Sequence, residues 1–108
     1  MNDHDMIERC KQGDGEALGE LYDEHREHLL ILAIALLGCM DDAEDVLHDV
    51  CVNFVGRLRA FRLTGSLKGY LSICVANQAR NHRKRTAYRV AVDLDEAKAM
   101  VSGKASPA

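Results

Sequence analysis

The chain contains no tryptophan, a single proline and few aromatic residues. Runs of β-branched and aromatic residues, which are typical of strands, are also scarce. These absences favour helices over strands. With 108 residues, the chain is long enough to form one domain with a small core of its own. We therefore predict a single all-α domain.

No hydrophobic run is long enough to cross a membrane. The longest one, from Leu29 to Met40, has about half the length that a bilayer-spanning helix needs. The first ten residues lack the basic start and the apolar middle of a signal peptide. We expect a cytoplasmic protein that does not insert into a membrane.

The cysteines form no CxxC pair, and their positions are irregular: Cys10, Cys39, Cys51 and Cys74. All four fall among apolar residues with helical spacing. In a reducing compartment this pattern favours buried thiols over a disulfide framework.

No motif indicates catalysis or a metal site. His25 lies three residues before His28, and His48 three before Cys51, but neither pair has a third and fourth ligand at the usual spacing. The chain has no serine-centred elbow and no glycine loop of the kind that binds phosphate. We expect a protein that is not an enzyme and has no cofactor.

Charges of opposite sign are separated along the chain. Residues 1–54 contain 14 acidic and three basic residues, whereas residues 55–108 contain 11 basic and three acidic ones. No acidic residue occurs between Arg57 and Arg89. Such asymmetry suggests a basic face for a polyanion and an acidic face for a different partner. The alternative is that both are solvated helix surface.

Periodicity and capping residues predict the first two helices. The first covers Asp5 to Gln12 and ends at Gly13. Asp14 caps the second, which ends at Gly38. Its second half, LLILAIALL, is apolar on nearly all sides, so we expect other helices to cover it on most sides.

The third helix is predicted to begin at a capping box formed by Asp41 and Glu44 and to run to about Arg59. Its apolar stripe faces the core. The stripe consists of Ala43, Val46, Leu47, Val50, Phe54 and Leu58.

A short loop then leads to the last helix, which Ser66 caps and which runs from Leu67 to about Arg85. The periodic pattern decays after this point, so residues 87–108 are predicted to be a linker or a flexible tail. The expected architecture is a bundle of three or four helices over residues 1–86.

The outer face of the third helix is acidic and would repel nucleic acid. A basic protein surface is a better partner for it, with Val52 supplying apolar contact. This face consists of Asp42, Glu44, Asp45, His48, Asp49, Val52 and Asn53.

The basic segment from Arg57 to Arg89 contains nine positive charges, which suit phosphate contacts. Phe61 and Tyr70 add stacking surface, and Asn77 adds a donor and an acceptor. Stacking combined with hydrogen bonds to base edges suits a single strand better than a closed duplex. For Phe61 and Tyr70, packing in the core is an equally good interpretation.

The segments LLG, DDAEDVLHDV and RLRAFRLTGSLKGYLSICVANQARNHRKR follow one another in an order that resembles region 2 of bacterial sigma factors, particularly the extracytoplasmic-function (ECF) class. The resemblance runs from about Met6 to Thr86. It implies a helical bundle and a non-enzymatic promoter-recognition subunit of RNA polymerase that acts in transcription initiation.

The resemblance also implies partners for both charged regions. The acidic face would dock on the clamp coiled coil of the polymerase β′ subunit. The loop and the last helix would bind the non-template strand of the melted -10 promoter element. The residues concerned are Phe61, Arg62, Thr64, Ser66, Lys68, Tyr70, Asn77, Arg80, Arg83, Lys84 and Arg85.

In this family an anti-sigma protein commonly covers the same faces, so the resemblance makes such a partner a further expectation. The second domain of the family, which reads the -35 element, does not follow in this sequence. The chain is then expected to be either a fragment that ends in the linker, which we favour, or a natural one-domain variant. Two alternatives stay open. One is a small helical regulatory or protein-interaction module with a basic nucleic-acid-binding face and no polymerase role, and the other is a thiol or metal sensor.

Overall fold

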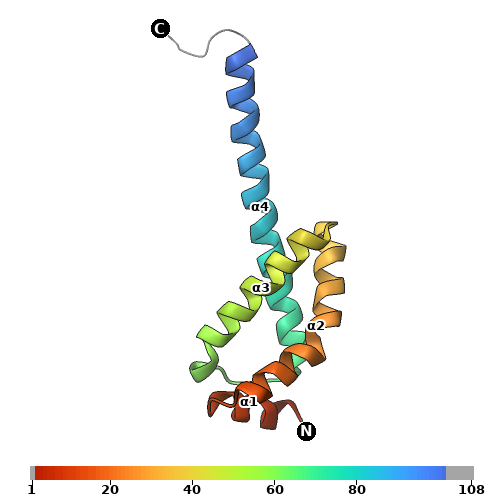
Figure 1. The fold of residues 1–108 in the computed structure, drawn as a ribbon, viewed down its shortest axis with the longest axis vertical. Helices are drawn as coiled ribbons and strands as arrows, with labels where there is room; N and C mark the ends of the chain where they lie inside the picture. The colour runs from red at the N-terminus through yellow and green to blue at the C-terminus, as the bar shows by residue number, and fades with distance from the viewer. Residues whose placement is uncertain (1, 102–108) are drawn as a thin grey trace.

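The computed structural model describes residues 2–101, which form a bundle of helices (Figure 1). The elements are α1 (Asp3–Lys11), α2 (Gly15–Leu37), α3 (Met40–Gly56), the short 3-10 helix η1 (Leu58–Ala60) and α4 (Leu67–Val101). The prediction of an all-α bundle is confirmed.

Polar side chains cap the first two helices. Asn2 precedes α1, and its Oδ1 accepts a hydrogen bond of 2.8 Å from the N–H of Asp5, so this helix begins two residues earlier than predicted. Asp14 caps α2 as predicted, because its Oδ1 accepts from two N–H groups of the first turn. Gly38 ends α2 with a φ of 76°, in the left-handed region that favours glycine.

The start of α3 differs from the prediction. The helix begins at Met40, its capping position is Cys39, and no side chain caps it, so the predicted capping box of Asp41 and Glu44 is wrong. Asp41 and Asp42 lie inside the first turn instead, where a carboxylate stabilises the positive end of the helix dipole.

The third helix is shorter than predicted, because it ends at Gly56 and does not continue to Arg59. After Gly56 the chain turns through η1 and then becomes extended. Gly65 has a φ of 119°, which glycine adopts without strain. The predicted role of Ser66 is confirmed, because its Oγ accepts from the N–H of Gly69 at 2.8 Å.

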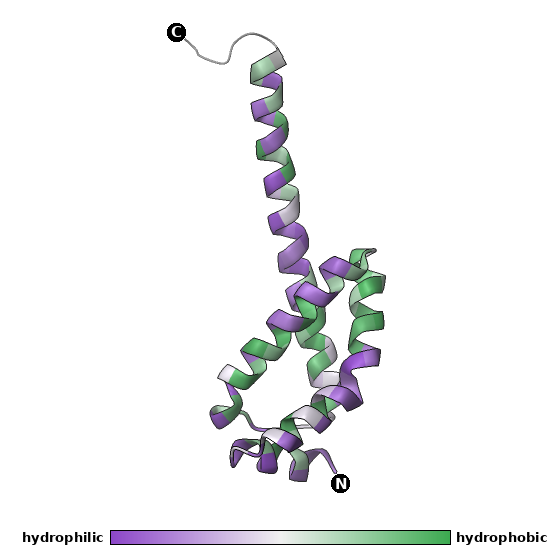
Figure 2. Ribbon diagram, in the orientation of Figure 1, coloured by the Kyte–Doolittle hydropathy of each residue, from purple (hydrophilic) through white to green (hydrophobic). Residues whose placement is uncertain are grey.

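The core lies between α2, α3 and the first half of α4, which pack against one another, while α1 packs against α2 and η1. Figure 2 shows that hydrophobic residues predominate in the first part of α4 and that hydrophilic residues follow. Every member of the predicted stripe of α3 and η1 is buried: Ala43, Val46, Leu47, Val50, Phe54 and Leu58. Two polar side chains take part in this packing. His25 is buried, and its Nε2 has no hydrogen-bond partner among the described residues. The carboxylate of Asp3 in α1 accepts a hydrogen bond of 3.1 Å from the N–H of Leu67 at the start of α4.

The second half of α2 is less covered than expected. Ile31 is 61% exposed and Leu36 is 37% exposed, whereas Leu29, Leu30 and Ala33 are buried. The expectation of cover on most sides was wrong because α3 and α4 pack against only part of the helix circumference.

The last helix is longer than predicted. It continues to Val101 rather than ending near Arg85, and it projects beyond the other helices (Figure 1). The sequence contains no glycine or proline between Tyr70 and Val101, so no residue interrupts the helix. The side chains from Arg83 to Lys98 are exposed. The part of the predicted tail that covers residues 102–108 lies outside the described residues.

Within residues 2–101, no helix combines the length and the apolar character that crossing a membrane requires.

Candidate functional site

The predicted acidic face lies on α3 and divides into two parts. We call the seven residues from Asp42 to Asn53 named above the acidic surface. Its exposed members are Glu44, Asp45, His48, Val52 and Asn53. Asp42 and Asp49 are only partly exposed.

Asp42 and Asp49 are less exposed because both face α4. Asp42 Oδ1 lies 3.3 Å from Nε2 of His82. The side-chain amide of Gln78 donates to Oδ2 of Asp49 at 3.4 Å. These two carboxylates therefore contribute to the contact between α3 and α4, and the exposed charge that remains for a partner comes from Glu44 and Asp45.

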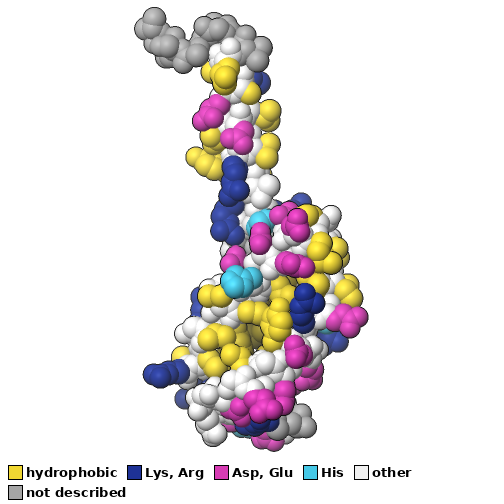
Figure 3. Space-filling model, viewed as in Figure 1, with side chains coloured by type: hydrophobic (Ala, Val, Ile, Leu, Met, Phe, Trp, Pro, Cys, Tyr) yellow, Lys and Arg dark blue, Asp and Glu magenta, His cyan; other side chains and the backbone are white. Residues whose placement is uncertain are grey.

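The exposed carboxylates border a hollow on the molecular surface. Glu44, Asp45 and His48 line it from α3, and Tyr22 and Arg26 line it from α2. Figure 3 shows acidic and basic side chains around a patch of hydrophobic side chains on one face of the bundle. Tyr22 and Arg26 were not among the predicted site residues, because the packing of α2 on α3 brings them here and no local sequence motif indicates it.

The basic residues of the segment from Arg57 to Arg89 are all exposed. We call these nine residues the basic surface, and none of them forms a salt bridge with another described residue. They are Arg57, Arg59, Arg62, Lys68, Arg80, Arg83, Lys84, Arg85 and Arg89. By contrast, the ion pairs of Arg9 and Lys11 lie in α1 and at its junction with α2.

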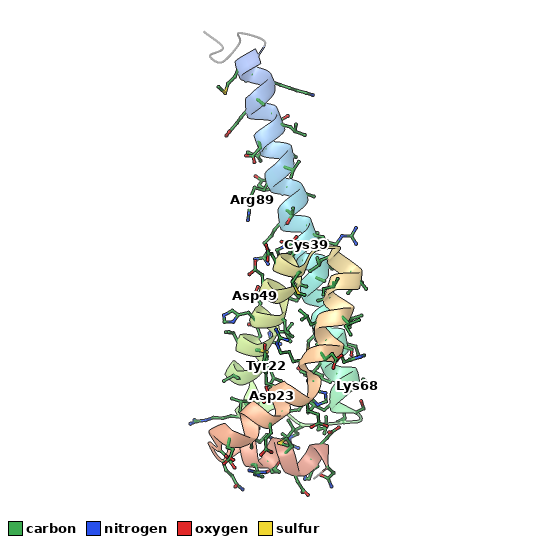
Figure 4. The ribbon with its side chains drawn as sticks, turned by 45° about the vertical axis from the view of Figure 1, so that its right-hand side comes forward. Tyr22, Asp23, Cys39, Asp49, Lys68 and Arg89 are labelled. Carbon is green, nitrogen blue, oxygen red and sulfur yellow. The ribbon has the colours of Figure 1, made fainter. Side chains whose placement is uncertain are left out.

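The basic surface is long rather than compact. Lys68 lies in the first turn of α4, and Arg89 lies on the part that projects from the bundle (Figure 4). At 1.5 Å per residue, the helix carries these two positions about 32 Å apart. An extended polyanion fits this distribution better than a small anion does.

Phe61 of the loop and Tyr70 of α4 pack on the core. The ring of Phe61 lies 5.3 Å from that of Phe54 and 4.8 Å from that of Tyr70, measured between centroids. Both Phe61 and Tyr70 are half-buried. Thr64 and Ser66 are exposed, although the Ser66 hydroxyl already accepts the capping hydrogen bond from Gly69.

A groove between α3 and α4 brings polar and aromatic groups together. Its volume is about 210 Å³, and Asn53, Arg57, Tyr70 and Asn77 contribute to its lining. Tyr70 and Asn77 were predicted to act together, and the structure places both in this groove. Burial, assisted by a hydrogen bond with Cys74, raises the pKa of the Tyr70 phenol above its ordinary value, which already keeps a phenol protonated near neutral pH.

Two members of this groove were missed or assigned elsewhere. Arg57 was recognised only as one of the nine basic residues, and Asn53 was assigned to the acidic surface. Their spacing of four residues at the end of α3 places them on one side of that helix, which is the signal that could have joined them.

Asn53 and Arg57 flank one side of the groove and Tyr70 and Asn77 the other, so amide, guanidinium and phenol groups meet in one depression. A comparison with protein families matches residues 21–89 to sigma-70 region 2. The chain belongs to the sigma-70 region 2 family. The match covers more than half of the chain and contains α3, the loop and the bundle part of α4. Comparisons with curated proteins and with solved structures gave no match.

Sigma-70 region 2 is a non-catalytic domain of transcription initiation with a role in promoter recognition by RNA polymerase. The family assignment agrees with the presence of two charged surfaces, because sigma-70 region 2 interacts with both RNA polymerase and promoter DNA. It leaves α1 and the start of α2 outside the matched range.

Proposed function

We propose that this domain is the -10-recognition part of a sigma factor of the ECF class. Its acidic surface binds the clamp coiled coil of the polymerase β′ subunit. Its basic surface, together with the groove between α3 and α4, binds the non-template strand of the melted -10 element. An anti-sigma protein that holds the factor inactive would cover the same two surfaces.

The observation that carries this proposal is the distribution of charge over the helices. The exposed acids Glu44 and Asp45 lie on α3, whereas nine exposed basic residues without a salt bridge within residues 2–101 lie on the following segment. Two surfaces of opposite sign allow one domain to hold a basic protein and a polyanion at the same time.

Single-stranded DNA is the polyanion that the groove suits best. Tyr70 offers an aromatic surface for stacking, Asn53 and Asn77 offer donors and acceptors for a base edge, and Arg57 offers a cation for a phosphate. In a closed duplex the Watson–Crick edges of the bases are paired and their faces are stacked on neighbouring bases, so neither is available to the groove. Arg80, Arg83, Lys84 and Arg85 continue along α4 and would hold further backbone phosphates.

The polymerase assignment is tested by titrating the chain against polymerase core and against the isolated clamp coiled coil. The double variant Glu44→Arg with Asp45→Arg reverses the two exposed carboxylates without touching those that face α4. The control is Asp93→Arg with Asp95→Arg, which makes the same change of charge at two exposed positions on the projecting part of α4.

We expect the double variant to lose core binding while it keeps its helical circular dichroism, and the control to bind as the wild type does. Equal affinity of the wild type and the double variant for core would contradict the assignment of the acidic surface. Equal affinity of the chain for single-stranded and duplex promoter DNA, with no affinity for the coiled coil, would favour the alternative of a basic regulatory module.

A further inference from the structure

A second, larger groove runs between α2 and α3 on the face that carries the acidic surface. Its volume is about 400 Å³, and its lining is almost entirely apolar. Leu18 and Tyr22 line it from α2, and Leu47, Cys51, Phe54 and Val55 line it from α3. Figure 3 shows hydrophobic side chains gathered in the hollow part of this face.

The groove is open because its α2 wall contains two glycines. Gly15 and Gly19 lie one helical turn apart, and a Cβ at either position would have no heavy atom within 4 Å outside its own neighbourhood. At its edge Val55 stays 47% exposed and Tyr22 37% exposed. An apolar depression of this size, bordered by exposed apolar residues, is typical of a binding site.

Charge indicates the kind of partner. The groove shares Tyr22, Arg26 and Cys51 with the neighbouring hollow that Glu44 and Asp45 border, so it is continuous with the acidic surface. A protein segment that meets these carboxylates with basic side chains comes within reach of the groove. At protein interfaces, a large side chain seated in a desolvated pocket gives most of the affinity, while charges at the rim steer the encounter.

We propose that this groove seats one large apolar side chain, such as a leucine, methionine or phenylalanine, from the polymerase segment that binds the acidic surface. The inference rests on the proposed function and adds the anchor that the charges alone do not supply. It assigns a role in binding polymerase core to four residues that do not belong to the acidic surface: Leu18, Gly19, Cys51 and Val55.

The test is to fill the groove with a side chain of the domain itself. Gly19→Leu places a side chain in the space that the partner residue would occupy, and leucine is a better helix former than glycine, so the bundle is expected to keep its fold. The matched control is Ala35→Leu, which adds a leucine to the same helix at an exposed position that does not line the groove. Thermal melts followed by circular dichroism check the fold of both variants.

We expect Gly19→Leu to weaken binding to polymerase core by about tenfold or more, and Ala35→Leu to bind as the wild type does. Wild-type affinity of Gly19→Leu, alongside loss of binding by the double variant Glu44→Arg with Asp45→Arg, would overturn the groove inference and leave the proposed function intact. Absence of core binding by the wild-type chain would contradict both. A dimer of the free chain that Gly19→Leu dissociates, measured by sedimentation, would instead show that the groove holds a second copy.

Cys51 gives an independent readout because it is half-buried in this groove. Bound core should slow the alkylation of Cys51 by iodoacetamide several-fold in the wild type. It should have no effect on the double variant Glu44→Arg with Asp45→Arg, which is expected not to bind. Alkylation of Cys51 at the same rate in free and core-bound wild type would also overturn the inference.

Discussion

The side-chain amide of Gln78 on α4 donates a hydrogen bond of 3.4 Å to the carboxylate of Asp49 on α3. One carboxylate of the acidic surface is therefore already used within the domain. Asp45, one turn earlier on the same helix, is exposed and has no such partner among the described residues. Two acids that look equivalent in the sequence thus have different surroundings.

Truncation should separate these two acids. Asp49→Ala removes a partly buried hydrogen bond between helices, so we expect the free energy of unfolding in urea to fall by about 0.5 to 1 kcal/mol. Asp45→Ala should change the unfolding free energy by less than about 0.5 kcal/mol, because it is a surface substitution. It should nevertheless weaken binding to polymerase core more than Asp49→Ala does.

A double-mutant cycle provides the control for Asp49. In a Gln78→Ala background, Asp49→Ala should cost less than it does in the wild type, because the partner has already gone. Additive losses would show that the two side chains do not interact.

The stability of the junction between α1 and α2 should depend on acid pH. Asp14 accepts from the N–H of Ala17 and from the guanidinium of Arg9, whose Nη2 lies 2.8 Å away, and these hydrogen bonds lower the pKa of its carboxyl group. A lowered pKa in the folded state gives stability that is present above the unfolded pKa and is lost as the pH falls through the folded pKa.

We therefore expect the melting temperature of the wild type to drop as the pH falls below about 4, with part of this drop absent from Asp14→Asn. Asparagine keeps the capping oxygen but has no carboxyl group to titrate. Parallel pH profiles of the two proteins below about 4 would contradict this assignment.

The cysteines should react in an order set by their burial. Cys39 is exposed, Cys51 and Cys74 are partly buried, and Cys10 is buried. Burial also raises the pKa of the Cys10 and Cys51 thiols, which lowers the fraction of reactive thiolate. Mass spectrometry of a time course with iodoacetamide should show Cys39 modified first and Cys10 last. Modification of Cys10 before Cys39 would show that α1 detaches from the bundle.

Binding to single-stranded DNA should depend on salt in proportion to the phosphates contacted. If the basic surface contacts about four phosphates, log affinity should fall against log salt concentration with a slope of roughly 3. Arg83→Ala should reduce this slope by about 0.7. Lys98→Ala, near the end of α4 and outside the basic surface, should leave it unchanged, and a flat dependence for the wild type would show that the basic surface does not bind phosphates.

Phe61 tests whether the loop aromatics pack or read bases. Its ring contacts both Phe54 and Tyr70, so we expect Phe61→Ala to lower the free energy of unfolding by about 2 kcal/mol. The neighbouring Arg62→Ala should leave stability unchanged, because Arg62 is exposed. A fully stable Phe61→Ala variant with reduced DNA affinity would assign the ring to base stacking instead.

Much of the fold could be predicted from local signals. Asp14, Gly38 and Ser66 act through hydrogen bonds and backbone angles within a few residues of themselves, so their roles at the helix ends were visible in the sequence. The stripe from Ala43 to Leu58 was predicted for the same reason, since a period of 3.6 fixes which side chains share a face. The end of α4 was not predicted correctly, because the length of a helix without an apolar stripe depends on helix propensity and on the absence of helix-breaking residues.

The candidate site was predicted only in part. The sequence singled out the acidic and basic segments, because charge is a property of the residues themselves. It did not show that Asp42 and Asp49 face α4, that Asn53 and Arg57 meet Tyr70 and Asn77 in one groove, or that Cys39 is exposed.

The sequence by itself thus determined the helical class, both ends of α2 and the start of α4, the separation of charge and the resemblance to sigma factors, because each depends on residue type and short-range spacing. The tertiary structure decided which carboxylates stay free, which aromatics are packed and where α2 and α3 leave a groove. These depend on which faces meet when helices distant in the sequence pack, and the angle and distance of that packing are not encoded in any single segment.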